Sequence, residues 1–135
     1  MAGYSETKLI DKLGIKPGHT VYIKNAPENY FRSLGDLPSG AQIKRKLTKD
    51  LDFIQIFTTE RKKLEENFPI MKNHLSKKGL FWVSWPKGSS KVQTDLNENI
   101  IRDIGLKEGL VDVKVCAVDD VWSGLKFVFR VKDRT

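Results

Sequence analysis

The sequence has one cysteine and two histidines in 135 residues, and this scarcity excludes several classes of site. Cys116 has no second cysteine with which to form an internal disulfide. A structural zinc site needs more cysteines and histidines than the chain contains, and His19 and His74 have no metal-ligating neighbours in the sequence. We therefore expect no metal site, and we expect Cys116, among the apolar residues Val113, Val115, Ala117 and Val118, to be a buried, unreactive thiol.

Long apolar runs are also missing. The longest run is far shorter than the roughly 18 residues of a membrane-spanning helix. The first residues lack the apolar core of a secretion signal. We therefore expect a cytoplasmic protein without membrane contacts. A chain of 135 residues with 39% hydrophobic composition fits one domain over 1–135, with an N-terminal helix within 1–14 and a sheet core over 20–131.

Negative charge is in deficit. Lysine and arginine number 24 against 17 aspartates and glutamates, so the formal net charge is +7. Such a chain attracts polyanions weakly at low salt. No helix-turn-helix, zinc-finger or aromatic RNA-binding motif accompanies the charge. We therefore expect most of the lysines to form solvated surfaces, and nucleic acid to bind only through non-specific charge.

The stretch from Gly79 to Trp85 is almost entirely apolar, and Pro86 follows it. This pattern is typical of a strand that is covered on both faces, as in a parallel sheet. Around it, strands are predicted over 20–25, 41–47, 51–58, 111–118 and 126–131, the second of them a charged edge strand.

Helices are predicted between these strands. They cover 5–13, with Ser5 as a cap, and 27–34, with Pro27 in the first turn and Tyr30, Phe31 and Leu34 buried. A third, capped by Thr58 or Thr59, buries Leu64, Phe68, Met71 and Leu75, with a kink at Pro69 and an end at Gly79. A fourth begins at a capping box of Asp95 and Glu98 and buries Leu96, Ile100, Ile101 and Ile104.

This order of elements predicts an α/β fold with helices on both faces of a mostly parallel sheet of about six strands. The last strand follows a short turn and must be antiparallel. The plan is that of a small three-layer Rossmann-like or methyltransferase-like domain.

Ligands of open α/β sheets bind beyond the carboxyl ends of the strands. The residues at those predicted ends form our candidate ligand-binding site: Asn25, Pro27, Thr58, Arg61, Trp85, Lys87, Asp119, Trp122 and Ser123. Trp85 and Trp122 are equally suited to packing and to ligand contact. Asp119 and Asp120 also fit a turn in which an aspartate binds its own backbone.

Glycine is missing where a nucleotide-binding turn needs it, since the turn after the first strand reads Asn25-Ala26-Pro27-Glu28. The sequence also lacks a Walker A motif and a Gly-x-Ser-x-Gly nucleophile motif, and Ser84 between two tryptophans fits a small packing residue better than a nucleophile. We therefore predict no catalytic residue and no bound cofactor.

Four segments resemble a family of bacterial proteins of unknown function, sometimes labelled StaR-like. They are LGIKPGHTVYIKNAPENY (13–30), WVSWPKGSS (82–90), TDLNENIIRDIGLKEG (94–109) and GLVDVKVCAVDDVWSGLKFVFR (109–130). The resemblance implies a bacterial cytoplasmic stand-alone domain and transfers no catalytic residue. The residues shared with the family pattern include Asn25, Pro27, Trp85, Pro86, Lys87, Asp119, Trp122 and Ser123.

The sequence leaves three functions open. The first is a non-enzymatic or degenerate Rossmann-like module that binds a small anionic or aromatic ligand, or a protein partner, at the strand ends. The second is a methyltransferase-like enzyme that uses S-adenosylmethionine through an atypical first loop. The third is a weak, non-specific nucleic-acid binder. The oligomeric state is not predicted.

Overall fold

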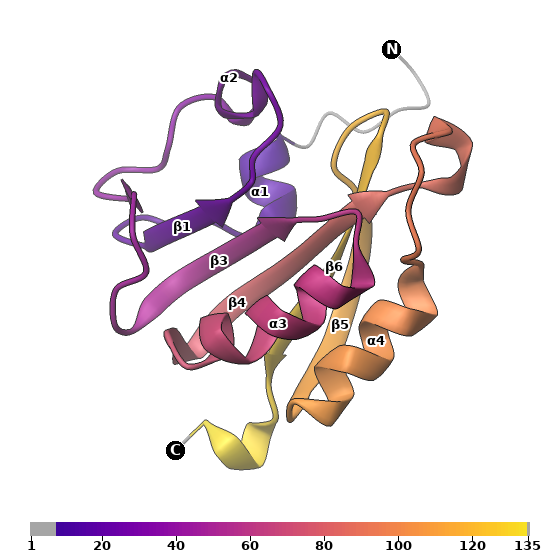
Figure 1. The fold of residues 1–135 in the computed structure, drawn as a ribbon. Helices are drawn as coiled ribbons and strands as arrows, with labels where there is room; N and C mark the ends of the chain where they lie inside the picture. Colours follow the sequence, from indigo (N-terminus) through magenta and orange to yellow (C-terminus); the bar gives the residue numbers. More distant parts are fainter. Residues whose placement is uncertain (1–7, 135) are drawn as a thin grey trace.

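A six-stranded sheet in the order β2-β1-β3-β4-β6-β5 forms the centre of the molecule in a computed structural model that describes residues 8–134 (Figure 1). Its strands are β1 (Thr20–Lys24), β2 (Gln42–Lys44), β3 (Leu51–Phe57), β4 (Leu75–Pro86), β5 (Leu110–Ala117) and β6 (Trp122–Phe129). The helices are α1 (Leu9–Leu13), α2 (Tyr30–Leu34), α3 (Arg61–Lys72) and α4 (Glu98–Lys107), with short 3-10 turns η1 (Gly88–Ser90) and η2 (Val131–Asp133). Among the described residues, no helix is long and apolar enough to cross a membrane.

The direction of the strands agrees with the sequence prediction. β2, β1, β3 and β4 are parallel, whereas β6 runs antiparallel to both of its neighbours, β4 and β5. The β5–β6 hairpin is too short for a crossover, so the last strand turns back and lies between β4 and β5. The predicted α/β fold with a mixed, mostly parallel sheet is confirmed.

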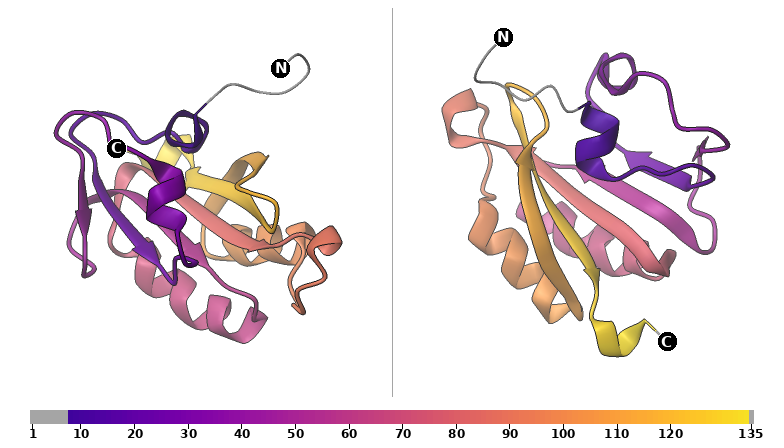
Figure 2. Two further views of the ribbon diagram at one scale, coloured as in Figure 1. Left: turned by 90° about the horizontal axis from the view of Figure 1, so that it is seen from above. Right: turned by 180° about the vertical axis from the view of Figure 1, so that it is seen from behind.

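Helices cover both faces of the sheet. α3 and α4 lie on one face and α1 and α2 on the other, which is clearest from above (Figure 2). Each face has its own hydrophobic core, and alternate residues of β4 enter the two cores. Phe81, Val83 and Trp85 pack under α3 and α4. Trp82 packs on the other face and donates its indole N–H to the Leu13 carbonyl at 2.8 Å. The predicted buried central strand is therefore confirmed.

Pro69 does not break α3, contrary to our prediction of a kink or of two helical pieces. The helix runs without interruption from Arg61 to Lys72. Pro69 removes one backbone hydrogen bond, to the carbonyl of Glu65. Glu65 lies on the exposed side of the helix, where a missing donor costs less than in the core. Leu64, Phe68 and Met71 form the buried face, as predicted.

The end of α3 also differs from the prediction. The helix stops at Lys72, and Leu75 already belongs to β4, where it lies opposite Leu51. The apolar spacing from Met71 to Leu75 therefore spans a helix end. The register slips between Leu51 and Phe53, and this irregularity includes the buried Gly79. A β-carbon there would lie 2.9 Å from the Leu51 carbonyl oxygen, so the site requires glycine.

The predicted helix caps were wrong at two positions. Asn97 caps α4 by accepting a hydrogen bond from the Ile100 N–H, so Asp95 and Glu98 do not form a capping box. Asp95 instead accepts from the Arg61 N–H at 2.7 Å, at the start of α3. Thr58 and Thr59 do not cap this helix, which begins after Glu60. The role of Asp95 at the start of α3 was missed because the two partners of this hydrogen bond are 34 residues apart in the sequence.

Other local predictions fail for reasons of exposure. Phe31 was expected in the core but is 47% exposed, because α2 is a single short turn that buries only Tyr30 and Leu34. Pro27 precedes α2 and is not part of it. Cys116 is only half-buried, since β5 is an edge strand. Ser5 lies outside the described residues.

Candidate functional site

The point where the order of the strands reverses marks the candidate site. The chain leaves β1 for β2 on one side and then returns to β3 on the other side of β1. Connections that leave neighbouring strands in opposite directions open a crevice at the carboxyl ends of those strands, where ligands of open α/β sheets bind. Here the crevice lies between the ends of β1 and β3, at Asn25 and Thr58.

Asn25 closes the top of this crevice. Its backbone has a φ of 60°, in the left-handed region that asparagine tolerates better than most residues. Its side-chain amide donates a hydrogen bond to the Phe57 carbonyl at 3.3 Å. The end of β1 is therefore tied to the end of β3 by a side chain that stands where a glycine-rich turn would leave space for a ligand.

Aromatic rings fill the crevice beneath Asn25, on the α1 and α2 side of the sheet. The rings of Tyr30 and Phe57 meet edge to face with their centroids 4.7 Å apart, and those of Phe57 and Trp122 with their centroids 5.1 Å apart. Tyr30 and Phe57 are 3% and 2% exposed. Such edge-to-face pairs stabilise the packing beyond the burial of their area.

A buried chain of hydrogen bonds supports the aromatic rings. The Tyr30 hydroxyl donates to Gln55 Oε1 at 2.7 Å, and Gln55 Nε2 donates to Ser84 Oγ at 3.0 Å. Burial raises the pKa of Tyr30 above its ordinary value, so the hydroxyl remains a proton donor. Gln55 and Ser84 are fully buried. Ser84 therefore serves packing and hydrogen bonding inside the protein, in line with the packing role predicted for it.

Four of the predicted site residues lie along the exposed edge of this crevice, and we call them the rim cluster: Asn25, Pro27, Lys87 and Trp122. Asn25 reaches Trp122 through Phe57, which contacts both. The Lys87 N–H donates to the Val121 carbonyl at 2.8 Å, which places Lys87 beside Trp122. Asn25 is exposed, and the other three are partly exposed.

The other predicted residues have their side chains elsewhere. Trp85 is 6% exposed and packs under α3 and α4, and Thr58 is buried, where its hydroxyl accepts from the Glu60 N–H. Arg61 pairs with Glu65 on α3. Ser123 directly follows Trp122 on β6, so its side chain points to the opposite face.

Asp119 has a structural role in the turn between β5 and β6. One of its carboxylate oxygens accepts hydrogen bonds from the Val121 and Trp122 N–H groups at 2.8 and 2.7 Å. The predicted alternative, an aspartate that binds its own backbone in a turn, is therefore confirmed. Through this bond Asp119 orients Trp122 within the rim cluster.

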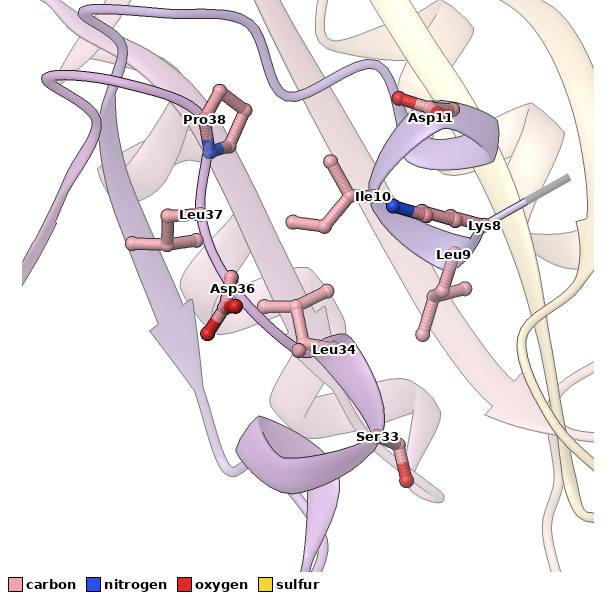
Figure 3. Close-up of a pocket in the computed structure, with 10 residues that line it drawn as sticks. Lys8, Leu9, Ile10, Asp11, Ser33, Leu34, Asp36, Leu37 and Pro38 are labelled. Atoms are coloured by element: carbon pink, nitrogen blue, oxygen red, sulfur yellow. The ribbon is translucent and has the colours of Figure 1, made fainter.

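The largest of the described pockets was not predicted from the sequence. It has a volume of about 640 Å³ and lies between α1 and the segment that follows α2 (Figure 3). Ile10 and Leu34 project toward the space between the two segments, and Leu37, Asp11 and Asp36 also line the pocket. No sequence signal marks this pocket, because it arises only when two short helices pack side by side.

A smaller pocket of about 330 Å³ lies near the carboxyl end of β3. Its walls come from Thr59 and Glu60 and from the segment Gln93–Asp95. The Thr94 hydroxyl donates to the Thr59 carbonyl at 2.7 Å, which fixes the loop after β4 over the end of β3. Among residues 8–134, no group of three His, Cys, Asp or Glu side chains is placed to hold a metal ion.

Comparison with solved structures identifies the fold as methyltransferase-like. A SAM-dependent methyltransferase from Aquifex aeolicus matches with a TM-score of 0.58 and 14% identity, covering 89% of this chain and 87% of that one. Magnesium protoporphyrin IX methyltransferase from Synechocystis, with bound SAH, matches with a TM-score of 0.57 and 10% identity, covering 90% of this chain and 78% of that one. A TehB-like SAM-dependent methyltransferase from Corynebacterium glutamicum matches with a TM-score of 0.56 and 11% identity, covering 96% of this chain and 91% of that one.

No protein-family model and no curated protein sequence matches the chain. At 10–14% identity the structural matches establish the fold alone. The predicted Rossmann-like, methyltransferase-like architecture is thus confirmed. The predicted membership of the StaR-like family stays a prediction.

Proposed function

We propose that this chain is a non-enzymatic, degenerate methyltransferase-like module that uses the rim cluster to bind a ligand or a segment of a partner protein. The observation that carries the proposal is the filled crevice at the strand reversal. Asn25 bridges the ends of β1 and β3, and the rings of Tyr30, Phe57 and Trp122 pack together below it. A cofactor would have to displace these groups, including two that are almost fully buried.

The rim cluster supplies the chemistry for binding outside the crevice. The Lys87 ammonium attracts an anionic group, and the partly exposed Trp122 indole offers an aromatic surface. The exposed Asn25 adds a polar group. This combination suits a small anionic or aromatic molecule, or a peptide that carries such side chains.

Amide chemical-shift mapping tests this proposal. Labelled protein is titrated with pools of nucleotides, amino acids, sugar phosphates and short acidic peptides. We expect saturable shifts at Asn25, Lys87 and Trp122 with one class of compound, and loss of those shifts in the double variant Lys87→Ala, Trp122→Ala. The matched control is Lys62→Ala, an exposed lysine on α3. Binding that persists unchanged in the double variant would overturn the proposal.

A second candidate function is methyl transfer from S-adenosylmethionine, favoured by the fold shared with SAM-dependent methyltransferases. In this case the first turn, Asn25-Ala26-Pro27, would hold the cofactor without glycine. Thermal unfolding distinguishes the candidates, because a ligand at a hundred times its Kd stabilises the folded state by about 2.7 kcal/mol. An unchanged Tm in millimolar S-adenosylmethionine favours the binding module, and a clear rise favours the enzyme.

A further inference from the structure

One face of the β5–β6 hairpin, which we call its back, points away from α3 and α4 and is covered by none of the helices within residues 8–134. α1 lies on this side of the sheet and packs against Trp82 of β4 (Figure 2, right). In this view none of the described helices lies in front of β5 and β6. Side chains of β6 that point to this face, such as Lys126, are therefore only partly buried.

Two lysines lie directly opposite each other on this surface. Lys114 of β5 pairs in register with Lys126 of β6. Like charges at directly opposite positions of an antiparallel pair destabilise the sheet. None of the four described salt bridges involves either lysine. Arg61, Lys63 and Arg102, on α3 and α4, are paired with carboxylates.

A β-bulge creates this pair. Asp112 lies opposite Phe127 and accepts a hydrogen bond from Arg102 of α4, on the face of the sheet that α3 and α4 cover. The register then slips, so that Lys114 lies opposite Lys126 instead of Val113. In a regular strand Asp112 and Lys114 would share a face. The bulge turns Lys114 to the back, where its ammonium donates to the Lys12 carbonyl at 3.2 Å. Bulges commonly redirect a side chain for function.

Protection of the sheet edge explains only one of the two lysines. Lys114 is on an edge strand, where charge discourages pairing with other chains. Lys126 is on β6, between β4 and β5, where no edge needs protection. Its ammonium lies 5.8 Å from the centre of the Trp82 ring. Burial, followed by the charges of Lys114 and Lys16, lowers the pKa of Lys126, so this position carries a cost.

We propose that the helix-free face of the β5–β6 hairpin binds the phosphodiester backbone of nucleic acid through Lys12, Lys16, Lys114 and Lys126, which we call the back-face lysines. Three separate segments contribute these cations, so the surface suits a chain of phosphates more than a single phosphate group. Such contacts carry affinity without base recognition.

Charge on this surface favours nucleic acid over a lipid membrane. Peripheral membrane binding combines cations with inserted aromatic or long aliphatic side chains. The described exposed side chains of that kind, Phe31, Ile43, Ile70 and Leu106, lie on α2, β2, α3 and α4. The exposed apolar side chains of the hairpin itself, Val113 and Val115, are short. None of the back-face lysines belongs to the rim cluster, although Trp122 and Lys126 share β6, so the inference goes beyond the proposed function and does not depend on it.

Fluorescence anisotropy with a labelled single-stranded oligonucleotide tests the proposal at several salt concentrations. The test protein is the double variant Lys114→Gln, Lys126→Gln. The control is the double variant Lys62→Gln, Lys107→Gln, which removes the same charge from exposed sites on α3 and α4. Loss of two phosphate contacts predicts a salt slope shallower by about 1.4 and binding weakened by about tenfold or more near 50 mM salt. The control should bind within about twofold of the wild type.

Stability measurements separate binding from folding in the same variants. Removal of a like-charge pair predicts that Lys114→Gln, Lys126→Gln melts at or above the wild-type temperature. Weakened binding in a fully stable variant supports the proposal. It is overturned if the wild type does not bind near 50 mM salt, if the control weakens as much as the variant, or if the wild type binds phosphatidylserine vesicles but not the oligonucleotide.

Discussion

At the residue scale, Tyr30 connects the filled crevice to a fully buried hydrogen-bond chain. Its hydroxyl donates to Gln55, which in turn donates to Ser84. All three residues are buried, and every buried side-chain polar atom among the described residues has a partner. A buried network of this kind is costly to interrupt, because the remaining members lose a partner that water cannot replace.

Replacement of Tyr30 by phenylalanine should therefore destabilise the protein. Tyr30→Phe keeps the ring against Phe57 but leaves Gln55 Oε1 without its donor. We expect a loss of about 1–3 kcal/mol in the free energy of unfolding at pH 7, measured by urea denaturation. Tyr22→Phe is the control, since this tyrosine is only partly buried. An equal loss in the control would contradict a special role for the buried hydroxyl.

The same tyrosine predicts a change of stability at alkaline pH. Burial raises the pKa of Tyr30 in the folded state, whereas in the unfolded chain it titrates near 10. Above that pH the unfolded state binds fewer protons than the folded state, so the contribution of Tyr30 to the free energy of unfolding falls as pH rises. The difference in unfolding free energy between wild type and Tyr30→Phe should shrink from pH 9 to pH 11. A constant difference would show that Tyr30 does not titrate in this way.

Asn25 is the residue at which backbone and side chain both serve the closed crevice. Asn25→Ala removes the hydrogen bond to the Phe57 carbonyl. It also places alanine, whose β-carbon is strained in the left-handed region, at a φ of 60°. We expect a cost of about 1–2 kcal/mol. Asn25→Gly loses the same bond but relieves the backbone, so it should cost less. Urea denaturation compares the two, and equal losses would contradict the role of the backbone.

Individual site residues were predictable only in part. The positions of Asn25, Lys87 and Trp122 follow from where strands end, and the structure places all three on one rim. Side-chain direction does not follow from this rule. Trp85 and Trp122 both stand at strand ends, yet strand alternation and register send Trp85 into the core under α3 and α4 and leave Trp122 partly exposed.

At the scale of elements, α4 depends on a glycine for its contact with the sheet. A β-carbon on Gly105 would lie 2.0 Å from the ring of Phe127 on β6. Gly105→Ala should therefore cost about 3 kcal/mol or more in unfolding free energy, despite the better helix propensity of alanine. Gly88→Ala is the control, because among the described residues no heavy atom beyond its own residue and its two chain neighbours would lie within 4 Å of the new β-carbon. A neutral Gly105→Ala would show that α4 can move away from β6.

Elements with strong local patterns were predicted well, whereas their ends were not. Most strands and the buried faces of α3 and α4 follow from apolar spacing, whereas the last strand was predicted over 126–131 and spans Trp122–Phe129. The end of α3 was not predicted, because Leu75 continues the apolar spacing of the helix although it already belongs to β4, opposite Leu51. The bulge that turns Lys114 to the back face depends on the register of β5 against β6, which the spacing of side chains along one strand does not contain.

At the scale of the whole molecule, the chain has a methyltransferase-like fold, and its own side chains fill the crevice at the strand reversal. The fold was predictable because strand order and handedness follow from a few topological rules. The filling was not, because it depends on how three segments far apart in the sequence meet: residues 25–30, Phe57 and Trp122.

Calorimetric titration of the wild-type protein with S-adenosylmethionine tests the central claim most directly. Because the crevice is occupied by Asn25, Tyr30 and Phe57, we predict no saturable heat at millimolar concentrations of the cofactor. Saturable heat with a stoichiometry near one, abolished when Asn25 is replaced by a larger residue such as Gln, would contradict it. In that case the crevice opens for the cofactor and the chain binds as methyltransferases do.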